Sequence, residues 1–539
     1  MLNSSTLHLN PPWPDLNGLC QPSLKRWQKP VAMHTNSAPS IQNVVEMRIY
    51  CTFLGKPQWM IGWPSPDFNN EQFRDERLEK LRKKFPDMDF VGGDIITDYT
   101  REKVEKIKKE IKNSDGLLLY TIGLYQDFFP LVKAGNELLE LGVPAVLANH
   151  LYGGDYVFLL LYENARRKNL RVVPASSADY EKVEEVIGIL VGVIRLKGQK
   201  IINITIDEPE IELSDEDRGR LMAVIEPEIA KIPDEAKEKM MGIATGGDYH
   251  IDVTGMDQCH QWRRDKEKYR KNLGELFGVE MVRAHPDDLI GLYEKVDSGD
   301  AEAVVKNWTE KAQTVDVTRE TLVNSAKLYL AIKRLMSGMG ADAITIDCAS
   351  AMMSGKLPAF PCMPFAQLNS EGATAVCESD MDCAITALLG QHITGRPGFT
   401  ANNAYDIPNN RITYLHCTAP FKLLGPEGPF SDYDILTHGD SRYVGASPSV
   451  KYPVGDLTTI KISVLEKKIA LRHGRVLGSV MDEKGCRNKV LVEADAKRVL
   501  ENYDEETFGW HRVSFAGESK DEMKMAAKLL GLEIVDEDD

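Results

Sequence analysis

The sequence lacks the features of membrane proteins, nucleic-acid-binding proteins and disulfide-rich secreted proteins. No apolar run approaches the roughly 18 residues that a membrane span requires, and the longest surrounds residues 157–161. The net charge is −16, and no stretch gathers enough Lys and Arg to follow a phosphate backbone. The nine cysteines are widely spaced and form no CxxC pair, which indicates reduced thiols in a cytoplasmic protein. We therefore expect no membrane and no nucleic-acid partner.

The N-terminal segment, residues 1–46, also lacks regular structure signals. It is rich in Pro, Asn and Ser, shows no hydrophobic periodicity and contains no apolar core of a secretory signal. We expect a disordered extension, and Met47 is an alternative start of the native protein.

What is present is typical of an enzyme with several domains. The chain has 539 residues, too many for one hydrophobic core, and its 43% hydrophobic and 27% charged residues are ordinary for a globular protein. From residue 47, strand and helix patterns alternate, which predicts a doubly wound α/β domain over 47–199. The main expected strands are 48–54, Gly116–Thr121 and 145–148, and the main expected helices are 70–85, 100–113, 131–141 and 178–197.

The same alternation returns after residue 200 and then stops. Expected strands at 200–206, 279–283 and 343–347, with helices between them, predict a second doubly wound α/β domain over 200–397. After residue 398 the segments become short and alternating, separated by Gly and Pro, so we expect a β-rich C-terminal domain over 398–539.

Residues 376–417 carry the densest group of candidate functional side chains. Glu378, Asp380 and Asp382 precede an amphipathic helix predicted over Met381–Thr394, and a polar turn over 402–406 is expected before the strand Arg411–His416. Carboxylates, amides and an imidazole at the ends of regular elements are the groups of a divalent-metal or polyol-binding site.

Each of these residues also has a purely structural interpretation. A carboxylate such as Glu378 at a helix N-terminus is often only a capping group. His416, which ends a strand, and His511, which begins one, can be satisfied core residues. Asp347 ends a strand and either faces a cleft or caps the following turn.

Three motifs resemble the L-fucose/L-arabinose isomerase superfamily, and in particular its fucose-isomerase-like branch. They are CESDMDCAITALLGQHITGRPGF, NRITYLHCTAP and GWHRVSFAGE, and the resemblance covers roughly residues 47–532. It implies two α/β domains followed by a β-rich domain, a divalent metal, typically Mn²⁺, and a sugar substrate. It also implies a homo-oligomer, of which a hexamer is one arrangement, with sites near subunit boundaries.

The resemblance also implies roles for individual residues. Glu378 corresponds to the first metal-binding carboxylate, His511 to the C-terminal histidine ligand, and His416 to a further histidine of the arabinose branch. Asn402 stands where the family has an acidic second ligand and catalytic group, and an amide cannot accept a proton. Asp406 is a candidate replacement, although the following turn can use it as an Asx-turn residue, and Asp347 and Glu371 are further candidates.

The expected function is therefore a metal-dependent interconversion of an aldose and a ketose through an enediol. Two alternatives remain open at this point. Asn402 favours a non-catalytic sugar-binding protein, and a lyase can use the same metal-stabilised enediolate. Trp262 and Arg263, in GMDQCHQWRRD, are candidate substrate contacts.

Overall fold

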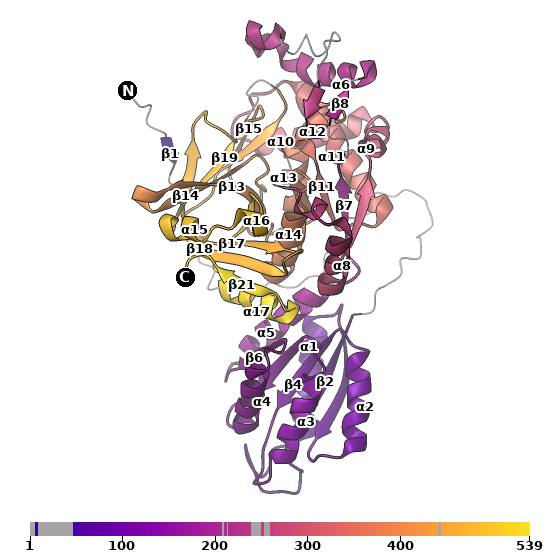
Figure 1. The fold of residues 1–539 in the computed structure, drawn as a ribbon, viewed down its shortest axis with the longest axis vertical. Helices are drawn as coiled ribbons and strands as arrows, with labels where there is room; N and C mark the ends of the chain where they lie inside the picture. The colour runs from indigo at the N-terminus through magenta and orange to yellow at the C-terminus, as the bar shows by residue number, and fades with distance from the viewer. Residues whose placement is uncertain are drawn as a thin grey trace.

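The computed structural model describes residues 6–8, 47–206, 210–212, 214–238, 250–252, 259–439 and 444–539. Two parallel α/β sheets follow one another along the chain, and a β-rich sheet follows them (Figure 1). This arrangement confirms the predicted fold class. Within the described ranges, no helix has the length and apolar content needed to cross a membrane.

The first sheet fills the lower part of the molecule in Figure 1 and has five parallel strands in the order β3-β2-β4-β5-β6. The order reverses between β2 and β4, as in a doubly wound sheet. All residues of β4 are buried, which fits a sheet with helices on both faces. The strands are β2 (Arg48–Leu54), β3 (Asp89–Ile96), β4 (Gly116–Thr121), β5 (Ala145–Asn149) and β6 (Val172–Ser176); the helices are α1 (Asn70–Lys84), α2 (Arg101–Lys112), α3 (Phe129–Leu139), α4 (Asp155–Arg167) and α5 (Tyr180–Ile194).

The second sheet has four parallel strands in the order β10-β7-β11-β12. Register pairs Ile346 of β11 with Cys377 of β12 and with Ile204 of β7, so the carboxyl ends of these three strands meet at one edge. The strands are β7 (Lys200–Ile204), β10 (Glu280–Ala284), β11 (Ala343–Ile346) and β12 (Thr374–Cys377); the helices include α8 (Lys266–Phe277), α9 (Pro286–Tyr293), α10 (Ser298–Lys311), α11 (Arg319–Met339), α12 (Cys348–Met353), α13 (Cys362–Glu371) and α14 (Met381–Thr394).

The third sheet is mainly antiparallel and closes on itself. Strand β18 pairs with both β17 and β19, so six strands form a ring in the order β18-β17-β20-β13-β14-β19. They are β13 (Phe399–Asp406), β14 (Arg411–His416), β17 (Gly455–Ser463), β18 (Lys468–Met481), β19 (Asn488–Glu493) and β20 (Arg512–Ala516); β21 (Glu533–Asp536) adds to β18, and α17 (Lys520–Leu530) precedes it.

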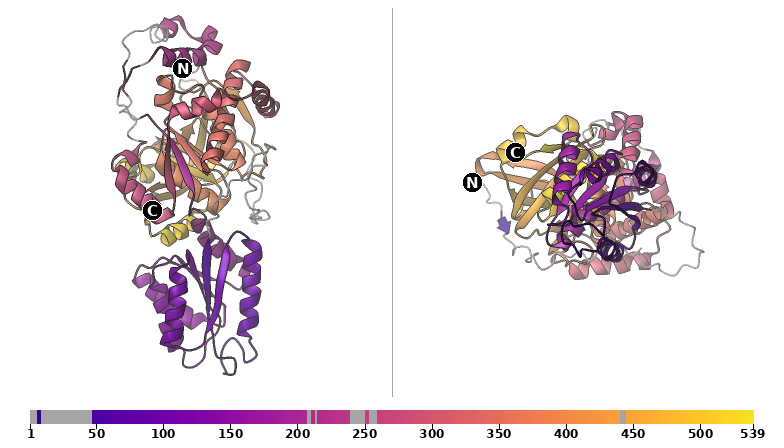
Figure 2. Two further views of the ribbon diagram at one scale, coloured as in Figure 1. Left: turned by 90° about the vertical axis from the view of Figure 1, so that its right-hand side faces the viewer. Right: turned by 90° about the horizontal axis from the view of Figure 1, so that it is seen from below.

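Helix α14 connects the three parts. It is buried from Met381 to Gln391 and packs against α5 of the first part and against β17 and β20 of the third. Because α14 contacts the C-terminal part of α5 around Gly192, the carboxyl edge of the first sheet lies at the other end, away from the other two sheets (Figure 2).

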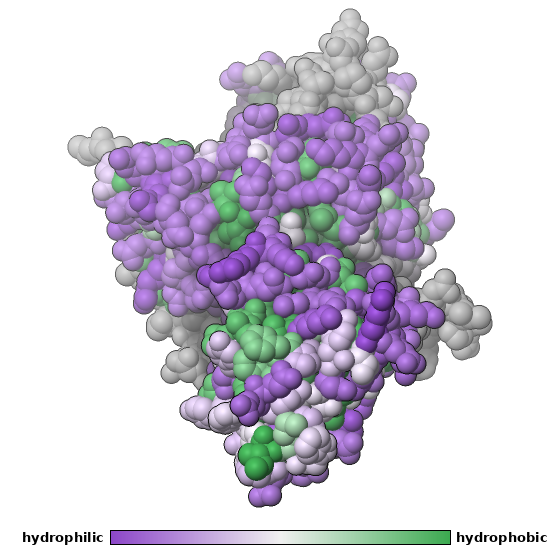
Figure 3. Space-filling model, turned by 60° about the horizontal axis from the view of Figure 1, so that its bottom comes forward, coloured by the Kyte–Doolittle hydropathy of each residue, from purple (hydrophilic) through white to green (hydrophobic). Residues whose placement is uncertain are grey.

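Large apolar side chains are exposed at that carboxyl edge. They lie in the loops or helix starts that follow β2, β4 and β5, and Figure 3 shows apolar atoms gathered over this end of the molecule. They are Trp59, Ile61, Trp63, Phe129, Tyr152 and Tyr156. Exposed apolar groups at one edge are typical of a contact surface.

Three local features differ from the sequence-based expectations. Residues 402–406 belong to strand β13 rather than to a polar turn, because pairing with β14 overrides the weak strand preference of Asn402 and Asn403. Helix α4 is missing from the predicted elements because its apolar residues run continuously. In the expected N-terminal extension, β1 (Thr6–His8) pairs with the edge of β18.

Candidate metal centre

Glu378 lies at the carboxyl edge of the second sheet, in a strained turn between β12 and α14. Glu378 and Ser379 have φ angles of 63° and 52°. This left-handed region costs a non-glycine residue about 1–2 kcal/mol. Two hydrogen bonds hold the turn: Ser379 N donates to Ile346 O at 3.0 Å, and Trp262 Nε1 donates to Ser379 O at 3.0 Å. Strain retained in this way is characteristic of functional sites.

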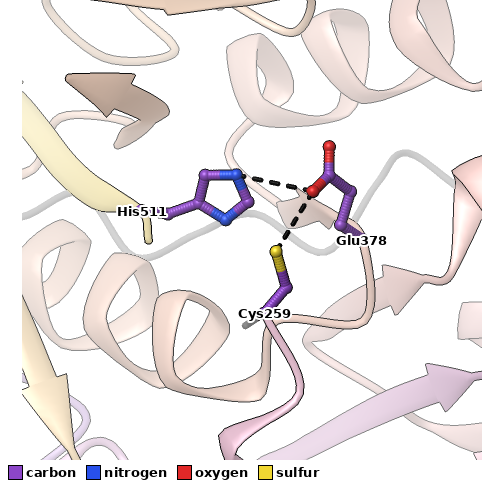
Figure 4. A group of neighbouring side chains, drawn as sticks. All are labelled: Cys259, Glu378 and His511. Carbon is purple, nitrogen blue, oxygen red and sulfur yellow. Dashed lines mark hydrogen bonds and ion pairs between the residues drawn. The ribbon is translucent and has the colours of Figure 1, made fainter. Parts of the chain in front are cut away.

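Three side chains from distant segments converge on the Glu378 carboxylate. Cys259 Sγ and His511 Nε2 lie 3.2 and 3.5 Å from Oε2 (Figure 4). His416 Nε2 lies 3.4 Å from Oε1. The two imidazoles and the thiol are buried, whereas the Glu378 side chain keeps 20% of its surface exposed. The centre therefore meets solvent at the carboxylate.

A second carboxylate orients His511 from behind. His511 Nδ1 donates to Asp380 Oδ2 at 3.1 Å, and Lys461 Nζ donates to both Asp380 oxygens at 2.8 and 2.9 Å. Lys461 and Asp380 are fully buried. Although burial alone would raise it, the pKa of the Asp380 carboxyl is held below its ordinary value by Lys461 and His511. An ionised Asp380 fixes a proton on Nδ1, so Nε2, the nitrogen that faces Glu378, is the one that can bind a metal once it loses its proton.

The charges at the centre reinforce one another. Burial alone would raise the pKa of Glu378, but His511 and His416 lower it to about 2. Burial disfavours a charged imidazole, yet the Glu378 carboxylate raises the pKa of His416 to about 9. Glu378 is thus an anion across the physiological range, and this anion attracts cations.

These residues fit a divalent cation. The ligand atoms of Cys259, Glu378 and His511 all lie within 4.8 Å of one another. Nε2 of His511 and Nδ1 of His416 have no hydrogen-bond partner among the described residues, although both imidazoles are buried. Buried polar atoms without partners are uncommon and indicate an ion, a ligand or water. A carboxylate with imidazole suits Mn²⁺, and the thiol adds affinity for softer ions such as Zn²⁺.

Asp380 and Cys383 form another cluster with His511, but its chemistry differs. Both oxygens of Asp380 already accept hydrogen bonds from Lys461, and Asp380 also caps α14 by accepting from Cys383 N at 2.7 Å. A carboxylate neutralised by a buried ammonium is a poor ligand. We therefore assign Asp380 to orienting His511.

The structure places Asn402 beside this centre without a direct contact to Glu378. Asn402 pairs with Leu415, the neighbour of His416, and Ala401 pairs with Arg512, the neighbour of His511. Its Oδ1 is buried and has no hydrogen-bond partner within the described part of the chain. Asn402 therefore has an unused acceptor and lies on a strand that pairs with both histidine-bearing strands.

Two other predicted residues lie elsewhere. Asp406 is exposed at the far end of the β13–β14 hairpin and accepts two hydrogen bonds from Asn409, the Asx-type alternative. Glu371 ends α13 at the amino edge of β12 and binds Tyr329 and Lys333. Since Glu378 follows the carboxyl end of β12, the structure does not bring Asp406 or Glu371 to the centre.

Asp347 lies next to Glu378 and forms a second polar group with His260 and Arg263. Because β11 and β12 are paired up to Ile346 and Cys377, the two carboxylates follow at the ends of neighbouring strands. His260 Nε2 and Arg263 Nη2 lie 3.9 and 3.7 Å from Asp347 Oδ2. Burial raises the pKa of Asp347 and, together with Arg263, lowers that of His260 to about 4.

Sequence reasoning missed Cys259, His260 and Lys461. Cys259 and His260 precede a 3-10 turn, η4 (Gln261–Arg263), and Lys461 lies within the regular strand β17. The one usable signal was Lys461 itself, since a lysine between Ile460 and Ile462 in a strand is buried only when it has a partner.

No protein-family model matches the chain. Among curated proteins, a sulfoquinovose isomerase from Clostridium sp. (strain MSTE9) is 28% identical over 180 residues, which is 32% of this chain and 39% of that protein. The chain thus matches less than half the length of this relative. The similarity is to a sugar isomerase, and it is distant and partial.

Proposed function

We propose that the protein is a metal-dependent sugar isomerase that interconverts an aldose and a ketose through an enediol. The observation that carries the proposal is the convergence of Glu378, His511 and His416 at the carboxyl edge of the second sheet. The partial similarity to sulfoquinovose isomerase and the resemblance of the sequence motifs to sugar isomerases support the same reaction class.

Glu378 and His511 would hold the divalent metal, with Cys259 and His416 as neighbouring donors. When bound, such a metal polarises the substrate carbonyl and stabilises negative charge on the sugar oxygens. Asp380 and Lys461 keep His511 in the ligating tautomer. The expected ion is Mn²⁺.

The unused hydrogen-bonding atoms around the metal centre support a polyhydroxy substrate. Asn402 leaves Oδ1 without a hydrogen-bond partner among the described residues, and the His260 ring lies 3.9 Å from Asp347, too far for a hydrogen bond to it. Sugar hydroxyls both donate and accept hydrogen bonds, so they satisfy imidazole and amide groups alike. These atoms are therefore compatible with the sugar substrate of the proposed reaction.

The experiment combines metal binding with turnover. Calorimetry with Mn²⁺ should give one site per chain in the wild type, and Glu378→Gln should lose it. NMR on a panel of aldoses that includes sulfoquinovose should then detect a ketose product and exchange of the C2 hydrogen with deuterated solvent. Isomerisation that proceeds unchanged in the presence of a strong chelator would rule out the metal-dependent reaction.

A sugar-binding protein without activity is the second candidate, because Asn402 occupies the position of the family acid. The same NMR experiment separates the two functions. Sugar binding without exchange at C2 favours the binding protein, and cleavage products in place of a ketose favour a lyase.

We also propose that the protein forms a homo-oligomer. The exposed apolar side chains at the carboxyl edge of the first sheet, among them Trp59 and Ile61, support contact between copies. Light scattering after chromatography should give a mass above 60.3 kDa, and Trp59→Ser with Ile61→Ser should lower it.

A further inference from the structure

Three loops of the second sheet meet around Asp347. Asp347 N donates to Ile204 O of β7 at 2.8 Å, and Ser379 N, next to Glu378, donates to Ile346 O. Arg263 Nη2 donates to Thr205 Oγ1 at 2.6 Å and to Ile206 O at 2.8 Å, which joins the η4 turn to the end of β7. The Asp347 side chain, 1% exposed, is therefore enclosed at the same edge that carries Glu378.

The Asp347 carboxylate is paired less closely with its surroundings than most buried carboxylates. It occupies the N-cap position of α12 but makes no capping hydrogen bond. Arg263 donates to Thr205 and Ile206 rather than to Asp347, and Ser350 of α12 interacts with the carboxylate from the same element. A buried carboxylate kept for stability is normally paired and fully hydrogen-bonded. Asp347 is therefore held by long contacts with Arg263 and His260 rather than by a close ion pair, which leaves room for a substrate group.

We propose that Asp347 is the carboxylate that moves the proton between C1 and C2 of the sugar. It would replace the acidic residue that the resembled family has at the position of Asn402. The inference depends on the proposed isomerase function. Glu378, its neighbour across β11 and β12, is engaged with Cys259, His416 and His511, whereas Asp347 is not. Two carboxylates with separate tasks at one edge meet the requirement of an enediol mechanism.

The proton transfer balances without any external oxidant or reductant. Asp347 takes the proton from C2 of the open-chain aldose, and the C–H electron pair becomes the C1=C2 bond. The π pair of the C1 carbonyl moves to O1, which takes up a proton from water, and the proton later released from O2 returns to water. The O2–H proton then leaves, its electron pair forms the C2 carbonyl, and the C1=C2 pair takes the proton back from Asp347 onto C1. C1 is reduced and C2 is oxidised.

His260 and Arg263 act as positioning residues in this scheme. They lie on the Oδ2 side of Asp347, at 3.9 and 3.7 Å, and so restrict the carboxylate without neutralising it by a hydrogen bond. His260, whose ring lies too far from Asp347 for a hydrogen bond to it, is available to the hydroxyl groups of the same sugar.

The decisive variant is Asp347→Asn in the full-length, Mn²⁺-loaded protein. We expect Mn²⁺ binding and sugar binding to persist, the C2 hydrogen exchange to disappear and kcat to fall at least about 100-fold. Asp406→Asn, which changes an exposed carboxylate at the far end of the hairpin, is the matched control and should keep wild-type kcat.

A second variant shows whether a loss of activity in Asp347→Asn comes from misfolding rather than from the missing carboxylate. Asp347→Ala should regain part of its exchange when formate is added, because a small carboxylate fills the space of the missing group. Wild-type exchange in Asp347→Asn, or no rescue by formate in a folded Asp347→Ala, would refute the role of Asp347 alone. A wild-type protein that binds Mn²⁺ but neither isomerises nor exchanges any aldose would instead refute the isomerase function, and the inference with it.

Discussion

His511 Nδ1 lies 3.1 Å from Asp380 Oδ2, and this hydrogen bond directs the opposite nitrogen of the ring toward Glu378. Asp380 is in turn held by Lys461, a fully buried ammonium from the third sheet. The ligating form of His511 thus depends on a charge pair that has no contact with solvent. Substitutions of Asp380 or Lys461 should therefore change the metal affinity of the centre.

Lys461→Met tests this dependence. The substitution leaves Asp380 buried without its cation, and we expect the free energy of unfolding to fall by about 3–5 kcal/mol. Metal affinity should fall about 10- to 100-fold, because an outer partner of a histidine ligand is lost. Denaturant unfolding and calorimetry with Mn²⁺ measure the two effects. The double variant Lys461→Met with Asp380→Asn should recover much of the stability but not the affinity; recovery of both would contradict the orienting role.

Ser379 tests the strain in the turn. Its φ of 52° favours glycine, while its hydroxyl donates to Asn203 Oδ1 at 2.7 Å. Both Ser379→Ala and Ser379→Gly lose this bond, but only glycine relieves the strain. We expect the glycine variant to be more stable than the alanine variant by about 1 kcal/mol, the reverse of the usual order. Equal stabilities in urea unfolding would show that the turn is not strained.

Glu537 tests the anchoring of the C-terminal segment. This buried carboxylate pairs with Arg472 and Arg512, both fully buried on the third sheet. Glu537→Ala leaves two buried guanidinium groups uncompensated, so we expect a loss of about 3–5 kcal/mol in urea unfolding. The control is Glu533→Ala, whose 3.4 Å pair with Lys468 is solvent-exposed and should change stability by less than about 1 kcal/mol.

His392, which lies away from the metal centre, should make the stability of the folded protein depend on pH. Burial and Arg195 lower its pKa from 6.5 to about 4 in the folded protein. Between these values the unfolded chain binds a proton that the folded protein does not, so this group should lower the stability as the pH falls from 6.5 to 4. The melting temperature over this range should drop less steeply in His392→Gln; an unchanged slope would show that His392 does not contribute.

The regular elements were predictable where local patterns and tertiary packing agree. The predicted bounds of α14 and β14 match the structure, because apolar periodicity, an Asp cap and a Gly stop all indicate the same ends. Strand β13 was not predictable, since its asparagines have no local preference for a strand and the partners β14 and β20 supply the pairing.

The candidate site was predictable only in part. Motif resemblance selected Glu378, His511 and His416, and these three side chains lie together. Cys259 and Lys461 were not selected, because no recognised motif includes them and only the fold brings them to the centre from segments more than 70 residues away. For the same reason the sequence could not show that Asp347 lacks a capping role.

The metal centre draws on residues 259, 378, 416 and 511, which belong to the second and third parts of the chain. No shorter N-terminal piece that ends before residue 511 can assemble it. Under the proposed function, metal binding would report whether synthesis and folding have reached completion, and a bound ion would stabilise the junction of these two parts by mass action. In a cell, metal supply and the lifetime of the folded protein would be coupled.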